Sequence, residues 1–324
     1  MSKAIQIHAH GGPEVLKLVD LKLPRPGRGE VQVAIKAIGM NFIDIYQRSG
    51  LYPQNLPFVP GGEMCGEIVA VGKDVKDLYI GDRVATATAG HGCYAEVANI
   101  KAEKLVRVPR GISDETAAAM MLKGMTAQYL LRQVYRVGKD DTILVHAAAG
   151  GVGLIMGQWA KALGATVIGT VGSAAKVKLA RTHGYDYVID YSKKDFAKEV
   201  KRITKGALLP VVYDSVGAAT FPASLDCLQR FGLFVSYGNA SGPVPAFAPA
   251  VLAQKGSLFM TRPTLFDFVR TPAELQQVAG ELFRVVKQGK VKIEVHQRYA
   301  LQDAAEAQRD LAQRHTTGSI VLLP

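Results

Sequence analysis

Small residues at fixed spacing near the middle of the chain could bind a phosphate group. Ala148, Gly150 and Gly153 occupy the three marked positions of a G-x-G-x-x-G pattern, with alanine at the first. The pattern follows an apolar run, Thr142–Val145, and precedes a helical segment, 154–163. Backbone N–H groups at such a turn can approach a pyrophosphate, and the helix dipole favours negative charge there. The pattern predicts dinucleotide binding; the alternative is a turn that only packs a helix against a strand.

The end of the next apolar run, Ala165–Val171, indicates which dinucleotide is bound. An NAD site usually has an acidic residue there to accept a hydrogen bond from the ribose 2′-hydroxyl. Here Ser173 and Lys176 follow, and no acidic residue lies between them. Because a hydroxyl and a positive charge suit a 2′-phosphate, the sequence favours NADP over NAD. The alternative is that Lys176 is a solvated lysine in the first turn of a helix.

The elements around this turn alternate between strand and helix. Such alternation predicts a doubly wound parallel sheet, an α/β fold. The expected strands are 142–145, 165–171, 187–189, 210–214, 233–237 and 257–260, and the expected helices are 154–163, 174–183, 194–203 and 221–228.

The first 110 or so residues have a different pattern. Strict alternation over Glu30–Ile38 predicts a strand, as does the short segment Tyr94–Ala98, and Asn41 is placed to cap a short helix. We therefore expect a β-rich domain here. Two helices, one from Ser113 and one over 125–136, should then lead to the central strand, and the last segments, helices 273–287 and 301–312 and strand 319–323, should return to the first domain.

Composition restricts the classes of function. The formal net charge is +11, but the basic residues are scattered among acidic and apolar ones, so we expect no nucleic-acid partner. The three cysteines, Cys65, Cys93 and Cys227, are far apart in the sequence, which argues against a disulfide framework. No apolar run is long enough for a membrane span and no signal peptide is evident, so we expect a cytoplasmic protein.

Together these motifs resemble the zinc-independent quinone oxidoreductases, the zeta-crystallin-like branch of the medium-chain dehydrogenase/reductase superfamily. The resemblance covers nearly the whole chain, through the segments 11–14, 39–44, 81–84, 147–153, 212–217 and 318–319. It implies a GroES-like catalytic domain formed by residues 1–123 and 265–324 and a Rossmann NADP-binding domain formed by residues 124–264.

The same comparison argues against a metal. The related zinc alcohol dehydrogenases have a catalytic Cys and a Gly-His-Glu turn, where this chain has Gly39-Met40-Asn41 and Gly61-Gly62-Glu63. The thiolate and imidazole ligands are therefore missing. His91 and Cys93 are a close pair, but two ligands do not make a tetrahedral site. We expect no zinc.

The resemblance also implies the site residues. Asn41, Tyr46 and Tyr52 should line the catalytic cleft, although Asn41 could simply cap a helix and the tyrosines could simply pack. The residues implied to bind NADPH are Asn41, Tyr46, Thr126, Gly150, Gly151, Val152, Gly153, Ser173, Lys176, Tyr191, Val216, Tyr237, Gly238, Ser241 and Arg314. Asp214 ends a buried strand and should either meet a ligand or cap the next turn, and His146 should be a packed residue at the end of a strand.

The expected activity is NADPH-dependent reduction of a quinone. Such a reduction is strongly downhill and needs no Lewis acid, whereas oxidation of an alcohol does. Two alternatives remain: an NADPH-dependent reductase of enals or enones, and an NADPH-binding protein associated with RNA. The resemblance further implies a homodimer joined through the edge strand near 257–261.

Overall fold

The computed structural model describes residues 1–313 and 315–324. The chain divides into two compact units. The first unit contains Met1–Met125, Val269–Lys287 and Ile293–Pro324, and the second contains Thr126–Phe268 and Gln288–Lys292.

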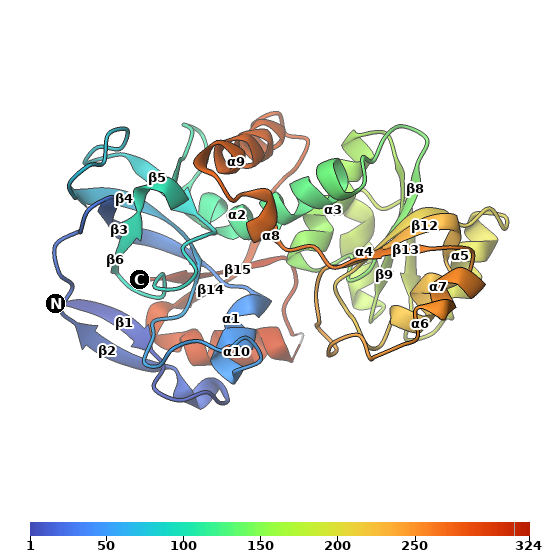
Figure 1. The fold of residues 1–324 in the computed structure, drawn as a ribbon, viewed down its shortest axis with the longest axis horizontal. Coiled ribbons are helices and arrows are strands. Elements are labelled where there is room, and N and C mark those ends of the chain that lie inside the picture. Colours follow the sequence, from blue (N-terminus) through green and yellow to red (C-terminus); the bar gives the residue numbers. More distant parts are fainter. Residues whose placement is uncertain (314) are drawn as a thin grey trace. The chain divides into compact units, whose positions relative to one another are not determined.

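The second unit is built on a six-stranded parallel sheet (Figure 1). Its strands lie in the order β10-β9-β8-β11-β12-β13, so the strand order reverses direction between β8 and β11. In open α/β sheets, ligands bind at the carboxyl ends of the strands at such a reversal. The strands are β8 (Thr142–Val145), β9 (Thr166–Val171), β10 (Tyr187–Asp190), β11 (Leu209–Asp214), β12 (Leu228–Ser236) and β13 (Phe259–Thr261).

The helices of the second unit connect these strands. They are α3 (Gly151–Ala162), α4 (Ala175–Thr182), α5 (Phe196–Ile203), α6 (Phe221–Leu225), α7 (Ala250–Gln254) and α8 (Leu265–Phe268). The α/β alternation predicted from the sequence is confirmed, but the helix expected over 221–228 is three residues shorter. It ends early because Leu228 already pairs with Leu209 as the first residue of β12.

One long helix, α2 (Asp114–Tyr129), replaces the two helices expected after Ser113, and a π-helical turn over Leu130–Val134 follows it. The prediction of a break was wrong because Gly124 stays helical. A Cβ at Gly124 would lie 2.5 Å from Cδ1 of Leu282, on the neighbouring helix α9 (Pro272–Lys287). The glycine therefore allows close helix packing rather than a turn.

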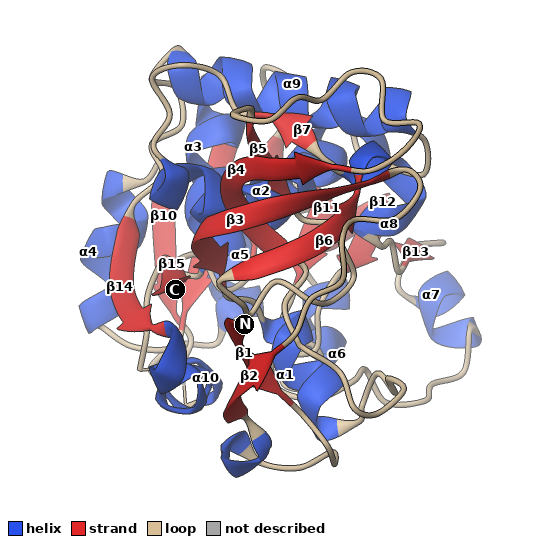
Figure 2. Ribbon diagram, turned by 90° about the vertical axis from the view of Figure 1, so that its left-hand side faces the viewer, coloured by secondary structure: helices blue, strands red, loops and turns tan. Residues whose placement is uncertain are grey.

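The first unit contains a seven-stranded sheet and a two-stranded one, shown in red in Figure 2. The larger sheet has the order β14-β15-β3-β4-β5-β7, and β6 also pairs with β3. The strands of the unit are β1 (Ser2–Gln6), β2 (Lys17–Leu21), β3 (Glu30–Gly39), β4 (Glu63–Val71), β5 (Arg83–Thr86), β6 (Val97–Lys101), β7 (Val106–Arg107), β14 (Val295–Ala300) and β15 (Ser319–Leu323). Its other helices are α1 (Phe42–Ser49) and α10 (Ala304–Ala312).

The strand expected at Tyr94–Ala98 begins later, at Val97. The preceding backbone is used in other contacts: the N–H of Tyr94 donates to the carbonyl of Pro60, and the N–H of Cys93 donates to the carbonyl of Gly61. These bonds hold residues 93–95 against the turn before β4 and keep Tyr94 buried.

Each unit has its own apolar core. Ile38, Met64 and Tyr94 belong to the core of the first unit, and Leu144 and Phe234 to that of the second; all five side chains are inaccessible to solvent. Among residues 1–313 and 315–324, no helix combines the length and the apolar character needed to cross a membrane.

Candidate functional site

The loop between β8 and α3 has the geometry of a phosphate cradle. Gly150 caps α3, and its N–H donates to the carbonyl of Ala147 at 2.8 Å. A Cβ at Gly153 would lie 2.3 Å from that same carbonyl oxygen, so glycine is required there. The first N–H groups of a helix have no partner within the helix, which leaves those of Gly151, Val152 and Gly153 directed at the loop. These residues fit a pyrophosphate.

A buried polar network lies at the same end of the sheet. Nδ1 of His146 is 2.8 Å from Oγ1 of Thr170, and Nε2 is 2.9 Å from Oγ of Ser224. The single hydroxyl hydrogen of Ser224 has the carbonyl of Thr220 as an acceptor at 2.8 Å, so Nε2 of His146 donates and Nδ1 accepts. Burial lowers the pKa of His146, and the nearby Asp214 carboxylate partly opposes this shift. His146 is therefore neutral in this network.

Asp214 links the network to the loop after β11. Its Oδ1 accepts the N–H groups of Val216 at 2.7 Å and Gly217 at 3.0 Å, and its Oδ2 accepts the hydroxyl of Thr220 at 2.7 Å. Asp214 was expected either to contact a ligand or to cap the next turn; in the structure it caps the turn. The sequence predicts only a packed role for His146 and gives no signal for Thr170, Thr220 or Ser224.

The loops after β11 and β12 hold each other in place. Oγ of Ser241 donates to the carbonyl of Val216 at 2.8 Å, and the backbone N–H of Ser241 donates to the same oxygen at 2.7 Å. Gly238 is packed so closely that a Cβ would lie 2.8 Å from the carbonyl oxygen of Ser215. The N–H of Tyr237 donates to the carbonyl of Asp214 at 2.8 Å. The four cofactor residues expected in these loops are thus brought together.

The residues expected around a 2′-phosphate gather at the ends of β9 and β10. A Cβ at Gly172 would lie 2.8 Å from Oη of Tyr191, so the tyrosine lies directly over this glycine. Lys176 is in the first turn of α4, and its N–H donates to the carbonyl of Ser173 at 3.2 Å. Ser173 and Lys176 therefore lie in one turn at the start of α4, and Tyr191 lies beside the preceding Gly172; a hydroxyl and a positive charge in this turn fit a phosphate. Arg314 lies outside the described residues.

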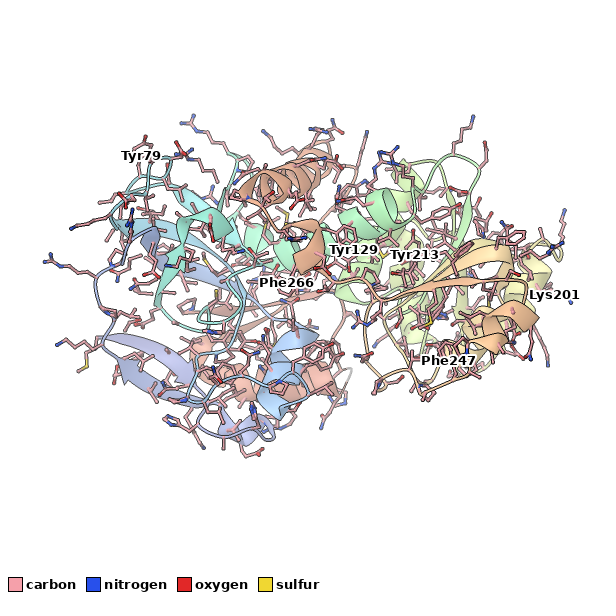
Figure 3. All side chains as sticks on the ribbon, in the orientation of Figure 1. Tyr79, Tyr129, Lys201, Tyr213, Phe247 and Phe266 are labelled. Carbon is pink, nitrogen blue, oxygen red and sulfur yellow. The ribbon has the colours of Figure 1, made fainter. Side chains whose placement is uncertain are left out.

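Thr126 lies in α2 with 9% of its surface exposed. The end of this helix, from Thr126 on, belongs to the second unit; Tyr129 in it and Tyr213 of β11 are labelled in Figure 3. The ring of Tyr129 stacks on Phe268 with centroids 4.4 Å apart, and Oη of Tyr213 donates to the carbonyl of Leu130 at 3.1 Å. These contacts fix the turn of α2 that carries Thr126.

In the first unit, Asn41, Tyr46 and Tyr52 lie in and beside α1. Asn41 precedes the helix, and its backbone N–H donates to Oδ2 of Asp44 at 2.9 Å. The rings of Tyr46 and Tyr52 meet edge to face with centroids 5.3 Å apart, and the N–H of Tyr52 donates to the carbonyl of Tyr46. The structure thus joins the two tyrosines as a pair on the element that Asn41 begins.

Three charged side chains surround Asn41 in the interior of the first unit: Asp44, Glu63 and Lys123, with exposed fractions of 1%, 1% and 7%. Nζ of Lys123 is 3.5 Å from Oε2 of Glu63, which in turn accepts Nδ2 of Asn41 at 2.6 Å. Burial raises the pKa of Asp44 to about 7. The sequence gives no local signal for these three residues, because only the fold brings them together.

Within residues 1–313 and 315–324, no group of three or more His, Cys, Asp or Glu residues is arranged to hold a metal ion. His91 and Cys93 gain no third partner of this kind there. The expected lack of zinc stays a prediction.

Comparisons with known proteins agree with this architecture. Residues 27–110 match the alcohol dehydrogenase GroES-like domain, and residues 151–283 match the zinc-binding dehydrogenase family. A quinone oxidoreductase of Pseudomonas aeruginosa is 54% identical, over 100% of both chains. This chain belongs to the quinone oxidoreductase family. The family lies within the medium-chain dehydrogenase/reductase superfamily, as expected, and the GroES-like and Rossmann folds are confirmed.

Two further members of the superfamily are informative. The structure of Escherichia coli quinone oxidoreductase complexed with NADPH has a TM-score of 0.98 and 49% identity, and the match covers 99% of this chain and 100% of that one. A 2-haloacrylate reductase of a Burkholderia species is 43% identical over 100% of this chain and 99% of its own length. A relative named as a 2-haloacrylate reductase is therefore similar to this chain over its whole length.

Proposed function

We propose that this chain is an NADPH-dependent quinone reductase that works without a metal. The observation that carries the proposal is the cofactor cradle of the second unit, in which a glycine turn opens α3 and Ser173, Lys176 and Tyr191 stand where an NAD site has a carboxylate. The full-length relatives named as quinone oxidoreductases support the substrate class. Overall, NADPH, a proton and a quinone give NADP⁺ and a hydroquinone.

Bound NADPH supplies the hydride, and the residues of this chain bind and orient the reactants. The N–H groups at the start of α3 hold the pyrophosphate, and Lys176 and Ser173 hold the 2′-phosphate. The other expected NADPH contacts are Asn41, Tyr46, Thr126, Tyr191, Val216, Tyr237, Gly238, Ser241 and Arg314. Asn41, Tyr46 and Tyr52 line the substrate site, where the edge-to-face pair of tyrosines offers aromatic surface to a quinone ring.

Reduction of an activated carbon–carbon double bond is the second candidate. The 43% identical 2-haloacrylate reductase favours it, because its name describes reduction of such an alkene. The same cradle would serve both reactions, since each delivers a hydride to an electron-poor carbon or oxygen.

The deciding experiment is NADPH oxidation by the purified, chelator-treated protein with 1,4-benzoquinone, in parallel with methyl vinyl ketone and 2-chloroacrylate. Turnover of the quinone with NADPH and slower turnover with NADH supports the proposal. Turnover of the alkenes alone assigns the second function. Turnover that disappears with the chelator and returns with zinc contradicts a metal-free reaction.

Three further expectations belong to this proposal. We assign residues 1–123 and 265–324 to the catalytic domain and residues 124–264 to the NADP-binding domain. We expect a homodimer joined through β13, an edge strand of the sheet whose Phe259 is 60% exposed. We also expect a cytoplasmic location, which agrees with three cysteines that are buried as free thiols.

A further inference from the structure

Asn41 is held by a carboxylate that uses both of its oxygens. Oε1 of Glu63 accepts the backbone N–H of Leu122 at 2.7 Å, and Oε2 accepts Nδ2 of Asn41 at 2.6 Å. Lys123 approaches the second oxygen at 3.5 Å and donates to the carbonyl of Met40 at 3.1 Å. The carboxylate is 1% exposed, so these bonds face no competition from bulk water.

Glu63 can approach Asn41 because residue 39 is a glycine. A Cβ at Gly39 would lie 2.2 Å from Oε2 of Glu63 and 2.2 Å from the carbonyl oxygen of Ala118. Gly39 thus lets the carboxylate reach Asn41, and its own carbonyl accepts the same amide nitrogen at 3.4 Å. Both hydrogens of Nδ2 are directed at acceptors inside the first unit.

The orientation of the Asn41 amide follows from this chemistry. A carboxylate accepts hydrogen bonds and does not donate them, so the nitrogen of the amide must face Glu63. The oxygen faces the start of α1, where it forms a capping box with the backbone N–H of Asp44, and its second lone pair can accept from a ligand. A ligand at Asn41 therefore meets an acceptor. A quinone carbonyl also only accepts, so Asn41 does not bind it while Glu63 holds the amide nitrogen.

We propose that Glu63, supported by Lys123, is a positioning residue that fixes Asn41 as a hydrogen-bond acceptor for an N–H or O–H group of the nicotinamide half of NADPH. The inference rests on the proposed function, in which Asn41 contacts the cofactor. The nicotinamide half carries such donors on its carboxamide and its ribose. Polarising the quinone carbonyl then falls to other groups of the site.

The variant Glu63→Gln tests this polarity. A glutamine has one acceptor oxygen, while Leu122 and Asn41 each present a donor. The backbone N–H of Leu122 cannot change, whereas the Asn41 amide can turn by 180°. In this variant the glutamine oxygen accepts from Leu122, and the glutamine nitrogen donates to the oxygen of Asn41. The nitrogen of Asn41 then faces the ligand, where it meets the N–H or O–H group that should have been accepted. Losing one such hydrogen bond corresponds to roughly tenfold weaker binding.

The measurement is binding of NADPH, followed by fluorescence titration, with 2′,5′-ADP as a matched ligand that lacks the nicotinamide half. Glu63→Gln should raise the Kd for NADPH about tenfold and leave that for 2′,5′-ADP unchanged. The control variant is Glu67→Gln, an exposed position on the same strand, which should change neither. Equal weakening of both ligands would show a merely structural role and overturn the proposal.

The double variant Asn41→Asp/Glu63→Gln distinguishes acceptor from donor. The glutamine at position 63 then donates to one carboxylate oxygen at position 41, and the other oxygen faces the ligand as an acceptor, with the net charge unchanged. An NADPH Kd within about threefold of wild type supports the proposal, and a Kd no better than that of Glu63→Gln overturns it.

The comparison of the double variant with the wild type still distinguishes an acceptor from a donor role of Asn41 if the single variant Glu63→Gln does not fold. A donor role for Asn41 would require a large loss in the double variant, because an aspartate has no N–H. These experiments measure NADPH binding and not quinone reduction, so they test the positioning role of Glu63 separately from the proposed function. A wild-type protein that binds NADPH but reduces no quinone would contradict the proposed function alone.

Discussion

Nε2 of His146 donates to Oγ of Ser224 at 2.9 Å, and this bond joins the end of β8 to α6 beneath the cofactor loop. The other ring nitrogen accepts from Thr170 in β9 at 2.8 Å. Asp214, at the end of β11, holds the next loop through two N–H groups. One neutral imidazole thus connects three neighbouring strand ends, all of which carry residues expected to bind NADPH.

Replacing this imidazole by an apolar side chain should disturb both the fold and the cofactor site. His146→Leu leaves the buried hydroxyls of Thr170 and Ser224 without their partner, which we expect to lower the free energy of unfolding by about 2–4 kcal/mol. NADPH binding should weaken severalfold because the loops lose their common support. Urea unfolding and fluorescence titration measure the two effects.

The exposed His8 provides the control, because His8→Leu removes an imidazole without opening a buried network. It should leave both quantities within error of the wild type. If His146→Leu behaves like His8→Leu, the network has no role in stability or in cofactor binding.

Asp44 should make stability depend on pH. Its pKa is raised from 3.8 to about 7 by burial. Between these values the folded protein keeps a proton that the unfolded chain has released, so the contribution of Asp44 to the free energy of unfolding decreases as pH rises, by up to about 1.4 kcal/mol per pH unit. Above about pH 7 this loss is complete.

Asp44→Asn cannot titrate and keeps an oxygen to accept from Asn41 and Tyr94. Relative to wild type, the variant should therefore become progressively more stable from pH 5 to about pH 7, and the difference should level off above that. Urea unfolding of both proteins across that range measures the difference, in which the titration of all other groups cancels. A difference that stays constant with pH would contradict a raised pKa.

The sequence predicted the parallel-sheet unit better than the polar interior of the first unit. Buried strands such as 142–145 have a local signal, because an apolar run next to a glycine turn has few other structures open to it. The cluster around Asn41 has no such signal: Glu63 and Lys123 are distant in sequence, and only the fold brings their side chains together.

Local sequence patterns gave a wrong or incomplete prediction where tertiary packing decides the structure. Two helices were expected between Ser113 and residue 136, but one helix, α2, runs through this region, and its Gly124 packs against Leu282. His146 was expected to be a packed strand-end residue. Its hydrogen bonds to Thr170 and Ser224 are tertiary contacts made by β8, β9 and α6, and the local sequence around His146 does not predict them.

Lys176 should distinguish the two nicotinamide cofactors. Lys176→Ala removes a positive charge near the position expected for the 2′-phosphate, so the KM for NADPH should rise roughly tenfold while that for NADH stays unchanged. Steady-state kinetics with each cofactor at saturating quinone measures the ratio. Lys178→Ala, an exposed position on the same helix, is the control. A proportional change for both cofactors would remove Lys176 from the phosphate site.

Gly153 should tolerate no side chain. The Cβ of Gly153→Ala would lie 2.3 Å from the carbonyl oxygen of Ala147, so the loop must shift and NADPH binding should fall at least tenfold. Gly280→Ala is the matched control, since no atom lies within 4 Å of its Cβ position in α9, and alanine there should stabilise the helix by about 0.5–1 kcal/mol. Unchanged NADPH binding in Gly153→Ala would contradict the cradle.

The expected dimer can be tested at the edge strand β13. Phe259 is 60% exposed on a strand that pairs with β12 on one side, and an apolar edge of this kind favours pairing with another chain. Phe259→Glu places a charge there and should convert a dimer to a monomer in sedimentation equilibrium. Ile80→Glu, at a residue 69% exposed in the first unit, should not. Because an edge strand buries its face only on pairing, the Phe259 variant should leave NADPH binding by the monomer intact; a wild-type monomer would refute the dimer directly.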